Sequence, residues 1–386
     1  ARRLTERALP FVLGAVLFTS ELSRAGSIAL LGLCLIVGFL YRREVVGDRW
    51  FLLVLSFFAL IALKDGVLLA LGTGSRLAFM KSSSRIPSLF GAAAMFIAVP
   101  KERREVSWLT AVGIVSIGMG TLVILMRKGL LPFTLNPNTF GMLFAWFPLG
   151  LGAMLRAKGG RAAWAGRAVL LAGLIILYTE ARFLDVQGSR TAALAFALGA
   201  FYLAVPDKIR RTTAIVIAAA AILAIIVFSL HYVPALDKAL AGRQELWQGY
   251  ASKGLERPLL GWGFTDGEDN KRLLDSTMRG KAIYGEFAYG GLGPHNGFLA
   301  MFFENGLFVF LGYVAIFLTA VWRGRGKAGI LPASLMAYVG FMSADAMAPG
   351  GITFLGFYLG LCLMAAGAAV DAAGEAATPG RKEATS

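Results

Sequence analysis

The sequence predicts an all-α polytopic membrane protein with about twelve transmembrane helices, arranged as a helical bundle. Hydrophobic residues make up 57% of the 386 residues and charged residues only 16%, which is far less charge than a soluble domain of this length exposes. Apolar runs recur along the whole chain, and the basic residues collect in the short turns between them. Together these observations make the bilayer the expected solvent.

Twelve apolar runs are candidate spans, and they lie near residues 8–23, 27–41, 50–72, 86–100, 107–126, 139–155, 167–181, 190–205, 212–231, 296–321, 329–345 and 351–370. The first two are short, and the third contains Lys64-Asp65. A cytoplasmic N-terminus places all the basic turns inside, as the positive-inside rule expects: RREVVGDR, KERRE, RAKGGRAAWAGR, PDKIRR and WRGRGK. Because a missed span would invert every later loop, this agreement supports the count to within one hairpin.

The same orientation places both termini in the cytoplasm and leaves one long segment, residues 232–294, on the outer side between the ninth and tenth spans. We therefore expect one transmembrane domain over residues 1–370 and a disordered tail over residues 371–386. In the outer segment, ALDKALAGRQELWQGY has Leu236, Leu240, Trp247 and Tyr250 at helical spacing, which predicts an amphipathic helix at the membrane surface. A loop of this length is typical of a lid or an active-site loop.

Composition also excludes several classes of protein. The formal net charge of +15 suits a nucleic-acid partner, but the basic residues are dispersed among short turns with no groove of interleaved aromatic side chains. We expect no nucleic-acid binding. Cys34 and Cys362 lie inside apolar runs, so we expect core residues rather than a disulfide framework or a metal site.

Some basic residues break the positive-inside pattern, because they fall on or near the outer side. They are Arg76, Lys81, Arg85, Arg182, Arg190 and Arg243. One interpretation is that these side chains snorkel to lipid headgroups. The other is that they hold an anionic group at the outer leaflet, since cations near a membrane are functional by default.

Four short stretches line up on this outer side. They are LNPNTFG (135–141), GSRTAALAF (188–196), GRQELWQGYASKGLERPLLGWGF (242–264) and GPHNGFLAMFFENG (293–306). In this order, before the last few helices, they resemble the O-antigen ligase and polymerase superfamily of membrane glycosyltransferases. The resembling residues are Asn136, Pro137, Asn138, Ser189, Arg190, Arg243, Trp247, Pro258, Gly261, Gly263, His295, Asn296, Glu304 and Gly306. The resemblance covers residues 136–306, and the first 130 residues only by hydropathy.

The resemblance implies a bundle related to the C-type glycosyltransferases in the bacterial inner membrane, with its active site facing the periplasm. The implied donor is a glycan on undecaprenyl diphosphate, transferred with inversion and without a metal or other cofactor. We favour an O-antigen ligase, which uses lipid A-core as acceptor during lipopolysaccharide assembly. The alternatives are a surface-polysaccharide polymerase with the same donor and, less favoured, a lipid-linked glycan flippase or transporter.

The leaving diphosphate needs positive charge, and a guanidinium fork matches phosphate oxygens while staying charged. Arg190 and Arg243 occupy the matched motif positions and are the first candidates for diphosphate binding; Arg85, Lys81 and Arg182 are candidates without a motif. Ser189, Asn296, Trp247, Asn136 and Asn138 are expected to support the motif. The acidic cluster DGED (266–269) is the alternative, a metal site, although a solvated loop is the favoured interpretation.

His295 is the candidate general base for the acceptor hydroxyl. Pro294 suits the first turn of a helix, which predicts His295 in that turn, kept neutral by the helix dipole and by nearby arginines. A capping or anchoring role is the alternative, and for His231 a structural role is favoured. Glu304 would lie on the opposite face of such a helix, about 13 Å along its axis, and is expected to secure packing. Phe298, Leu299 and Phe302 either line a polyprenyl groove or pack against a neighbouring helix.

Overall fold

The computed structural model describes residues 2–127, 137–183, 189–239, 243–265, 267–324, 329–343 and 354–368. Every regular element within these ranges is a helix, which confirms the all-α prediction. The predictions for Asn136 and for the tail 371–386 fall outside the described residues.

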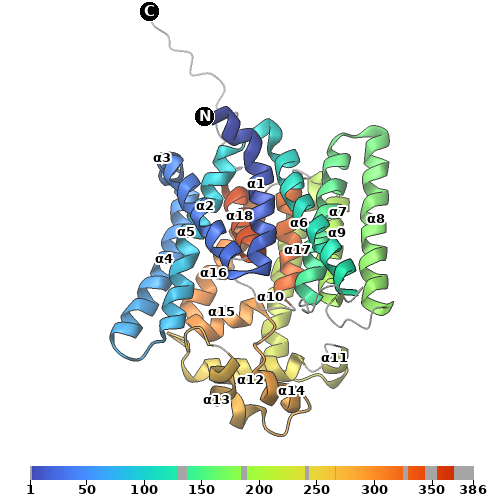
Figure 1. The fold of residues 1–386 in the computed structure, drawn as a ribbon. Coiled ribbons are helices and arrows are strands. Elements are labelled where there is room, and N and C mark those ends of the chain that lie inside the picture. Colours follow the sequence, from blue (N-terminus) through green and yellow to red (C-terminus); the bar gives the residue numbers. More distant parts are fainter. Residues whose placement is uncertain are drawn as a thin grey trace, which may run out of the picture.

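Twelve helices form an upright bundle (Figure 1). They are α1 (Arg2–Leu22), α2 (Arg24–Leu40), α4 (Arg49–Ala70), α5 (Arg76–Ala98), α6 (Arg104–Arg127), α7 (Pro137–Ala157), α8 (Gly160–Phe183), α9 (Ser189–Ala204), α10 (Asp207–Leu230), α16 (Leu307–Arg323), α17 (Ile330–Met342) and α18 (Phe354–Ala368). The short α3 (Arg42–Gly47) and the 3-10 turn η1 (Lys101–Arg103) connect bundle helices. Within the described residues, eleven of the predicted apolar runs each correspond to one helix, and the run 296–321 corresponds to two.

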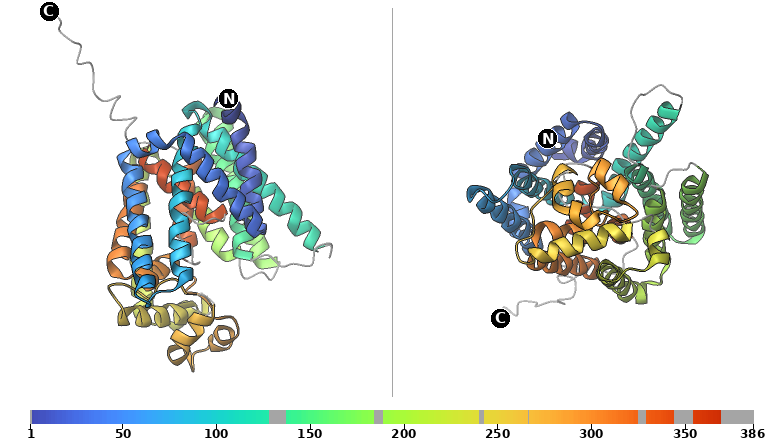
Figure 2. Two further views of the ribbon diagram at one scale, coloured as in Figure 1. Left: turned by 60° about the vertical axis from the view of Figure 1, so that its left-hand side comes forward. Right: turned by 90° about the horizontal axis from the view of Figure 1, so that it is seen from below.

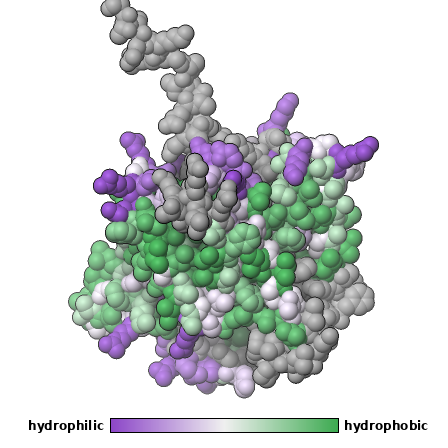
Figure 3. Space-filling view, turned by 45° about the horizontal axis from the view of Figure 1, so that its top comes forward, coloured by the Kyte–Doolittle hydropathy of each residue, from purple (hydrophilic) through white to green (hydrophobic). Residues whose placement is uncertain are grey.

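The exterior of the bundle is that of a membrane protein. Figure 3 shows an apolar band between hydrophilic surfaces above and below it. Among the described residues, four helical segments are long and apolar enough to cross a membrane, namely Arg49–Ala70, Lys101–Leu122, Gly160–Leu177 and Lys208–Leu230, and six more helices are apolar but shorter. The structure thus supports a polytopic membrane protein, and the count of twelve spans stays a prediction.

The interior of the bundle relies on close helix packing. The cysteine prediction is confirmed for Cys34, which is fully buried where α2 crosses α5. A Cβ on Gly91 would lie 2.3 Å from the Cβ of Cys34, so a glycine is needed at this crossing. At the centre, the Trp146 ring packs against Tyr338 and Tyr358 at centroid distances of 4.8 and 5.4 Å.

Residues between α10 and α15 (Gly297–Asn305) form a cap beneath the bundle, at the end opposite to the start of α1 (Figures 1 and 2). The cap comprises α11 (Pro234–Ala239), α12 (Arg243–Glu256), α13 (Gly267–Met278) and α14 (Tyr284–Gly290). It has a small core of its own, built by Leu246, Trp247, Tyr250, Leu274, Met278 and Phe287 and completed by α15. The predicted amphipathic helix through 235–250 corresponds to α11 and the start of α12, and its middle, residues 240–242, lies outside the described residues.

The predicted span 296–321 is also wrong as a single helix. The chain breaks at Gly306, which has φ +82°, and α15 and α16 lie on either side of the break. A Cβ at Gly306 would lie 2.2 Å from the carbonyl oxygen of Leu259, so the loop after α12 occupies that space. The break is therefore imposed by packing against a distant segment and is not visible in local hydropathy.

Candidate functional site

Arg243 is the first residue of α12 and lies against the start of α9. Its Nη1 donates a hydrogen bond to Thr191 Oγ1 at 3.3 Å, and Thr191 is buried in the first turn of α9. Ser189 and Arg190 precede Thr191 in the same turn, although their side chains lie outside the described set. The structure therefore brings the backbone of Arg190 next to Arg243, two positions that are 53 residues apart in the sequence.

A buried glutamine fixes the start of α12. The side-chain Nε2 of Gln244 donates to the carbonyl oxygens of Phe228 and His231, at 3.0 and 2.6 Å. The side-chain Oε1 accepts from Val233 N at 3.0 Å. Asp237 Oδ1 accepts the backbone N–H of Gln244 at 3.0 Å, which satisfies a donor that the first turn leaves free. Gln244 thus ties α12 to the end of α10 and holds Arg243 in place.

His295 and Asn296 reach the same end of the bundle. Asn296 is fully buried; its Oδ1 accepts from Leu299 N at 2.9 Å and its Nδ2 donates to Ser343 O at 3.2 Å. Ser343 ends α17, which runs antiparallel to α9: a Cβ on Gly340 would touch Ala195, and one on Gly199 would touch Ala333. The end of α17 thus lies near the start of α9, and three segments converge below the bundle.

The local prediction for His295 is wrong in one respect. His295 is not in the first turn of a helix: α15 begins at Gly297, Asn296 is its N-cap, and His295 precedes the cap with φ +44°. An asparagine is a strong N-cap because its side chain satisfies a free backbone N–H, and here it displaces Pro294 as the start signal. His295 therefore lies at the mouth of the helix, in the left-handed region that non-glycine residues rarely adopt.

A second group of charges gathers around Glu304, at the other end of α15. Desolvation raises the pKa of Glu304 to about 6, and the positive charges of Arg85, Lys81 and Lys64 oppose this rise. Lys64 also pairs with Asp65 at 3.1 Å and donates to Glu304 O and Asn305 Oδ1, at 3.3 and 3.0 Å. Three cations thus surround two carboxylates, which leaves one positive charge in excess.

Arg85 connects the charges around Glu304 with the segments around Arg243 and His295. It is largely buried in α5, and its charge acts on Tyr313 as well as on Glu304. Tyr313 Oη lies 3.3 Å from the Met342 sulfur, next to Ser343. The ammonium of Lys81 lies 3.6 Å from the centroid of the Phe264 ring. Arg85 and Lys81 are candidates from the sequence, whereas Lys64 and Asp65 are noted only as charges within a predicted span. Their position inside an apolar run is the signal that could have identified them as part of this group.

The glycine and proline positions of the resemblance have a structural role. The loop Arg257–Gly263 lies against residues 303–307 and exchanges backbone hydrogen bonds with them: Trp262 N to Phe303 O and Gly263 N to Glu304 O, both 2.9 Å, and Leu307 N to Pro258 O at 2.6 Å. A Cβ on Gly261 would lie 2.5 Å from the backbone of Glu304 and Asn305. The expectation that Glu304 and its neighbours serve packing therefore agrees with these contacts.

The remaining candidates have simpler settings. Trp247 is buried in the cap core, and Phe298, Leu299 and Phe302 pack rather than line an open groove, with Phe298 against Tyr313 and Phe317. His231 is the exposed C-cap of α10. The side chains of Asn138 and Arg182 lie outside the described set, although α7 and α8 contain both residues.

Of the acidic cluster 266–269, Asp266 lies outside the described residues, and Gly267, Glu268 and Asp269 form the first turn of α13. Glu268 is largely exposed and pairs with Lys271 at 2.8 Å on the first turn of α13. Within the described part of the chain, no three His, Cys, Asp or Glu side chains gather as a metal site would require.

Part of this region is similar to a known protein family. Residues 183–314 match a protein family described as O-antigen ligase. The matched segment runs from the last residue of α8 into α16, so it contains the start of α9, Arg243, the cap and His295-Asn296. It supports membership of the O-antigen ligase and polymerase family. No curated protein matches the chain, and no solved structure matches it either.

Proposed function

We propose that this chain, whose residues 183–314 match the O-antigen ligase family, transfers a glycan from undecaprenyl diphosphate to lipid A-core in the periplasm. One observation carries the proposal: Arg243, the start of α9 and His295-Asn296 converge at one end of an apolar bundle, where the cap meets it. A cationic and basic site at a membrane surface suits a reaction between two lipid-anchored substrates.

In the proposed reaction, His295 accepts the proton of the acceptor hydroxyl while the hydroxyl oxygen attacks the anomeric carbon of the donor. The bond from that carbon to the diphosphate oxygen breaks, with inversion, and its electron pair leaves with the diphosphate. Arg243 and Arg190 neutralise the developing charge, as guanidinium groups do for phosphate. Arg85 and Lys81 extend the positive potential from the side of α5, and no metal is required.

The test is a transfer assay with purified protein, undecaprenyl-diphosphate-linked glycan and lipid A-core. We expect product on lipid A-core. Glycan ladders made without lipid A-core would instead identify a polymerase, and lipid movement without transfer would identify a flippase.

Two variants test the residue roles. His295→Ala should bind donor but lose about 10²–10⁴-fold in turnover, the usual contribution of a general base. His231→Ala, the other histidine, is the matched control and should keep its rate. Arg243→Ala should weaken donor binding or the chemical step, and a wild-type rate in this variant would refute its role in diphosphate binding.

A further inference from the structure

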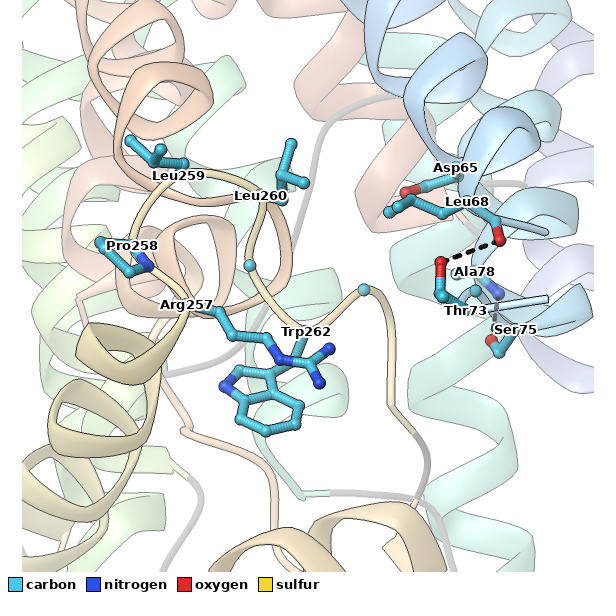
Figure 4. A pocket seen from close by; sticks show the side chains of 13 residues that line it. Asp65, Leu68, Thr73, Ser75, Ala78, Arg257, Pro258, Leu259, Leu260 and Trp262 are labelled. Carbon is cyan, nitrogen blue, oxygen red and sulfur yellow. Dashed lines mark hydrogen bonds between the residues drawn. The ribbon is translucent and has the colours of Figure 1, made fainter. Parts of the chain in front are cut away.

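An open cavity of about 630 Å³ lies between the α4–α5 turn and the loop after α12 (Figure 4). On one side it is lined by Asp65, Leu68, Thr73, Gly74, Ser75 and Ala78, and on the other by residues 257–263. It is separate from the group formed by Thr191, Arg243 and Asn296. Nothing in the proposed transfer step uses it.

The cap side of the cavity presents a cation on an aromatic ring. The guanidinium of Arg257 lies 4.0 Å from the centroid of the Trp262 ring, and Trp262 Nε1 donates to Lys253 O at 2.8 Å, which fixes the indole. Arg257 is exposed, and no hydrogen bond or ion pair holds its guanidinium among the described residues. Its donors are therefore available to a phosphate, the ligand that a guanidinium fork fits. Tryptophan is typical of the headgroup level of a membrane.

The rim of the cavity is apolar and exposed. Leu259 and Leu260 are 59% and 53% exposed, and Leu71, on the α4–α5 turn, is 69% exposed. These leucines border the apolar helix α4, so acyl chains are a favourable neighbour for them. The one carboxylate in the lining, Asp65, is paired with Lys64 and does not oppose an anion with its full charge. The cavity thus offers a phosphate site next to a surface for lipid tails.

Distance identifies which lipid fits. Arg257 follows the last residue of α12 and Arg243 is the first, so the two are 14 residues apart, or about 20 Å along the helix. Figure 2 shows this helix running across the underside of the bundle. The donor carries its diphosphate directly on the reacting carbon, so a donor cannot place phosphate at Arg257 while reacting beside Arg243. An acceptor that carries phosphate at its lipid base and its hydroxyl at the tip of an oligosaccharide can span both points.

We propose that this cavity binds the phosphorylated, acylated base of the acceptor glycolipid, with Arg257 on the phosphate, Trp262 at the headgroup and Leu259 and Leu260 against the acyl chains. The proposal rests on the proposed function, because it assigns the second substrate of the same reaction. It assigns the two substrates to opposite ends of α12.

Binding and turnover are measured separately, on the full chain in nanodiscs. Binding uses three probes: lipid A-core without O-antigen, the same lipid after chemical removal of its phosphates, and phosphatidylglycerol. Arg257→Ala should weaken binding of phosphorylated lipid A-core roughly tenfold or more, the effect of one charged hydrogen-bonding partner. In turnover, it should raise the KM for acceptor by a similar factor and leave the KM for donor unchanged. Arg272→Ala removes an exposed arginine of α13 and is the matched control.

A second variant distinguishes loss of the binding site from misfolding of the Arg257 variant. Thr73→Trp places bulk in the cavity from the α4–α5 turn, without changing any residue of the cap, and should weaken binding of the same probe while keeping Arg257. Equal binding of the phosphorylated and dephosphorylated lipids would overturn the proposal, as would equal binding of phosphatidylglycerol, which would make the occupant an ordinary phospholipid. Binding of lipid A-core that depends on Arg257, in a protein that transfers no glycan, would refute the proposed function but leave the acceptor site standing.

Discussion

The contact between the loop Arg257–Gly263 and the break at Gly306 can be tested with one methyl group. Gly261 has φ +68°, and an added Cβ would lie 2.5 Å from the Glu304 carbonyl carbon and oxygen and from Asn305 N. These are backbone atoms, so no side-chain rotation relieves the clash. Gly261→Ala must therefore move the loop away from residues 303–307.

The expected change in the free energy of opening follows from the backbone strain and the hydrogen bonds lost. A non-glycine residue in the left-handed region costs roughly 1–2 kcal/mol. Displacement also removes the bonds from Trp262 N, Gly263 N and Leu307 N, each worth about 1 kcal/mol. The free energy of opening this segment should fall by about 4–5 kcal/mol, which corresponds to amide exchange faster by a factor on the order of 10³ where opening limits exchange.

Hydrogen exchange on the purified protein, read for peptides that cover residues 258–265 and 303–307, measures this change. Gly72→Ala is the matched control, because Gly72 has φ +72° but nothing within 4 Å of its Cβ position. The control should show the backbone penalty alone, with no change at residues 303–307. Equal effects from the two variants would refute the reasoning, since the clash would then contribute nothing.

Three further predictions concern charge, capping and metals. Because the pKa of Glu304 is raised to about 6 from 4.5, the folded state holds that proton more tightly than the unfolded chain, and stability falls as pH rises through this range. Glu304→Gln should therefore melt higher than wild type at pH 7.5, by up to about 2 kcal/mol in stability, and the gain should vanish near pH 4.5; a pH-independent gain contradicts the assignment. Asn296→Ala should cost about 2 kcal/mol in thermal unfolding, because it removes the cap and the bond to Ser343, and an unchanged melting temperature would contradict this. Transfer activity should persist in EDTA, and rescue only by Mg²⁺ or Mn²⁺ would revive the acidic cluster as a metal site.

Hydropathy predicted most of this fold, because in a bilayer each helix must present an apolar surface over its whole length. In the described part of the chain, each predicted run except 296–321 corresponds to one helix, and the basic turns of the sequence agree with one orientation. The break at Gly306 was not predicted, because the sequence is apolar on both sides of it. The loop that packs against Gly306 lies some 45 residues earlier in the sequence. Only Asn305-Gly306, a common turn pair, marked the position locally.

The candidate site was predictable in part. Motif positions selected Arg243, Arg190 and His295, and the structure brings their backbone segments to one end of the bundle. The sequence could not reveal Thr191 as the partner of Arg243, or Lys64 as the anchor of the Glu304 segment, because both contacts join residues at least 50 positions apart. The prediction for His295 took Pro294 as the start of the helix, although Asn296 is a strong N-cap that accepts the backbone N–H of Leu299 and sets the start at Gly297.

The anchoring of Asn296 has a mechanical consequence. Through Ser343 it fastens the neighbourhood of His295 to the end of α17, whereas Arg243 begins α12. The two residues that we propose for one reaction are therefore held by separate contacts, His295 by way of Asn296 and Arg243 by way of Thr191 and Gln244. The seating of the cap on α9, where Arg243 meets Thr191, sets the separation between them. A substitution that shifts the start of α12 would therefore change the separation between Arg243 and His295 without altering either side chain.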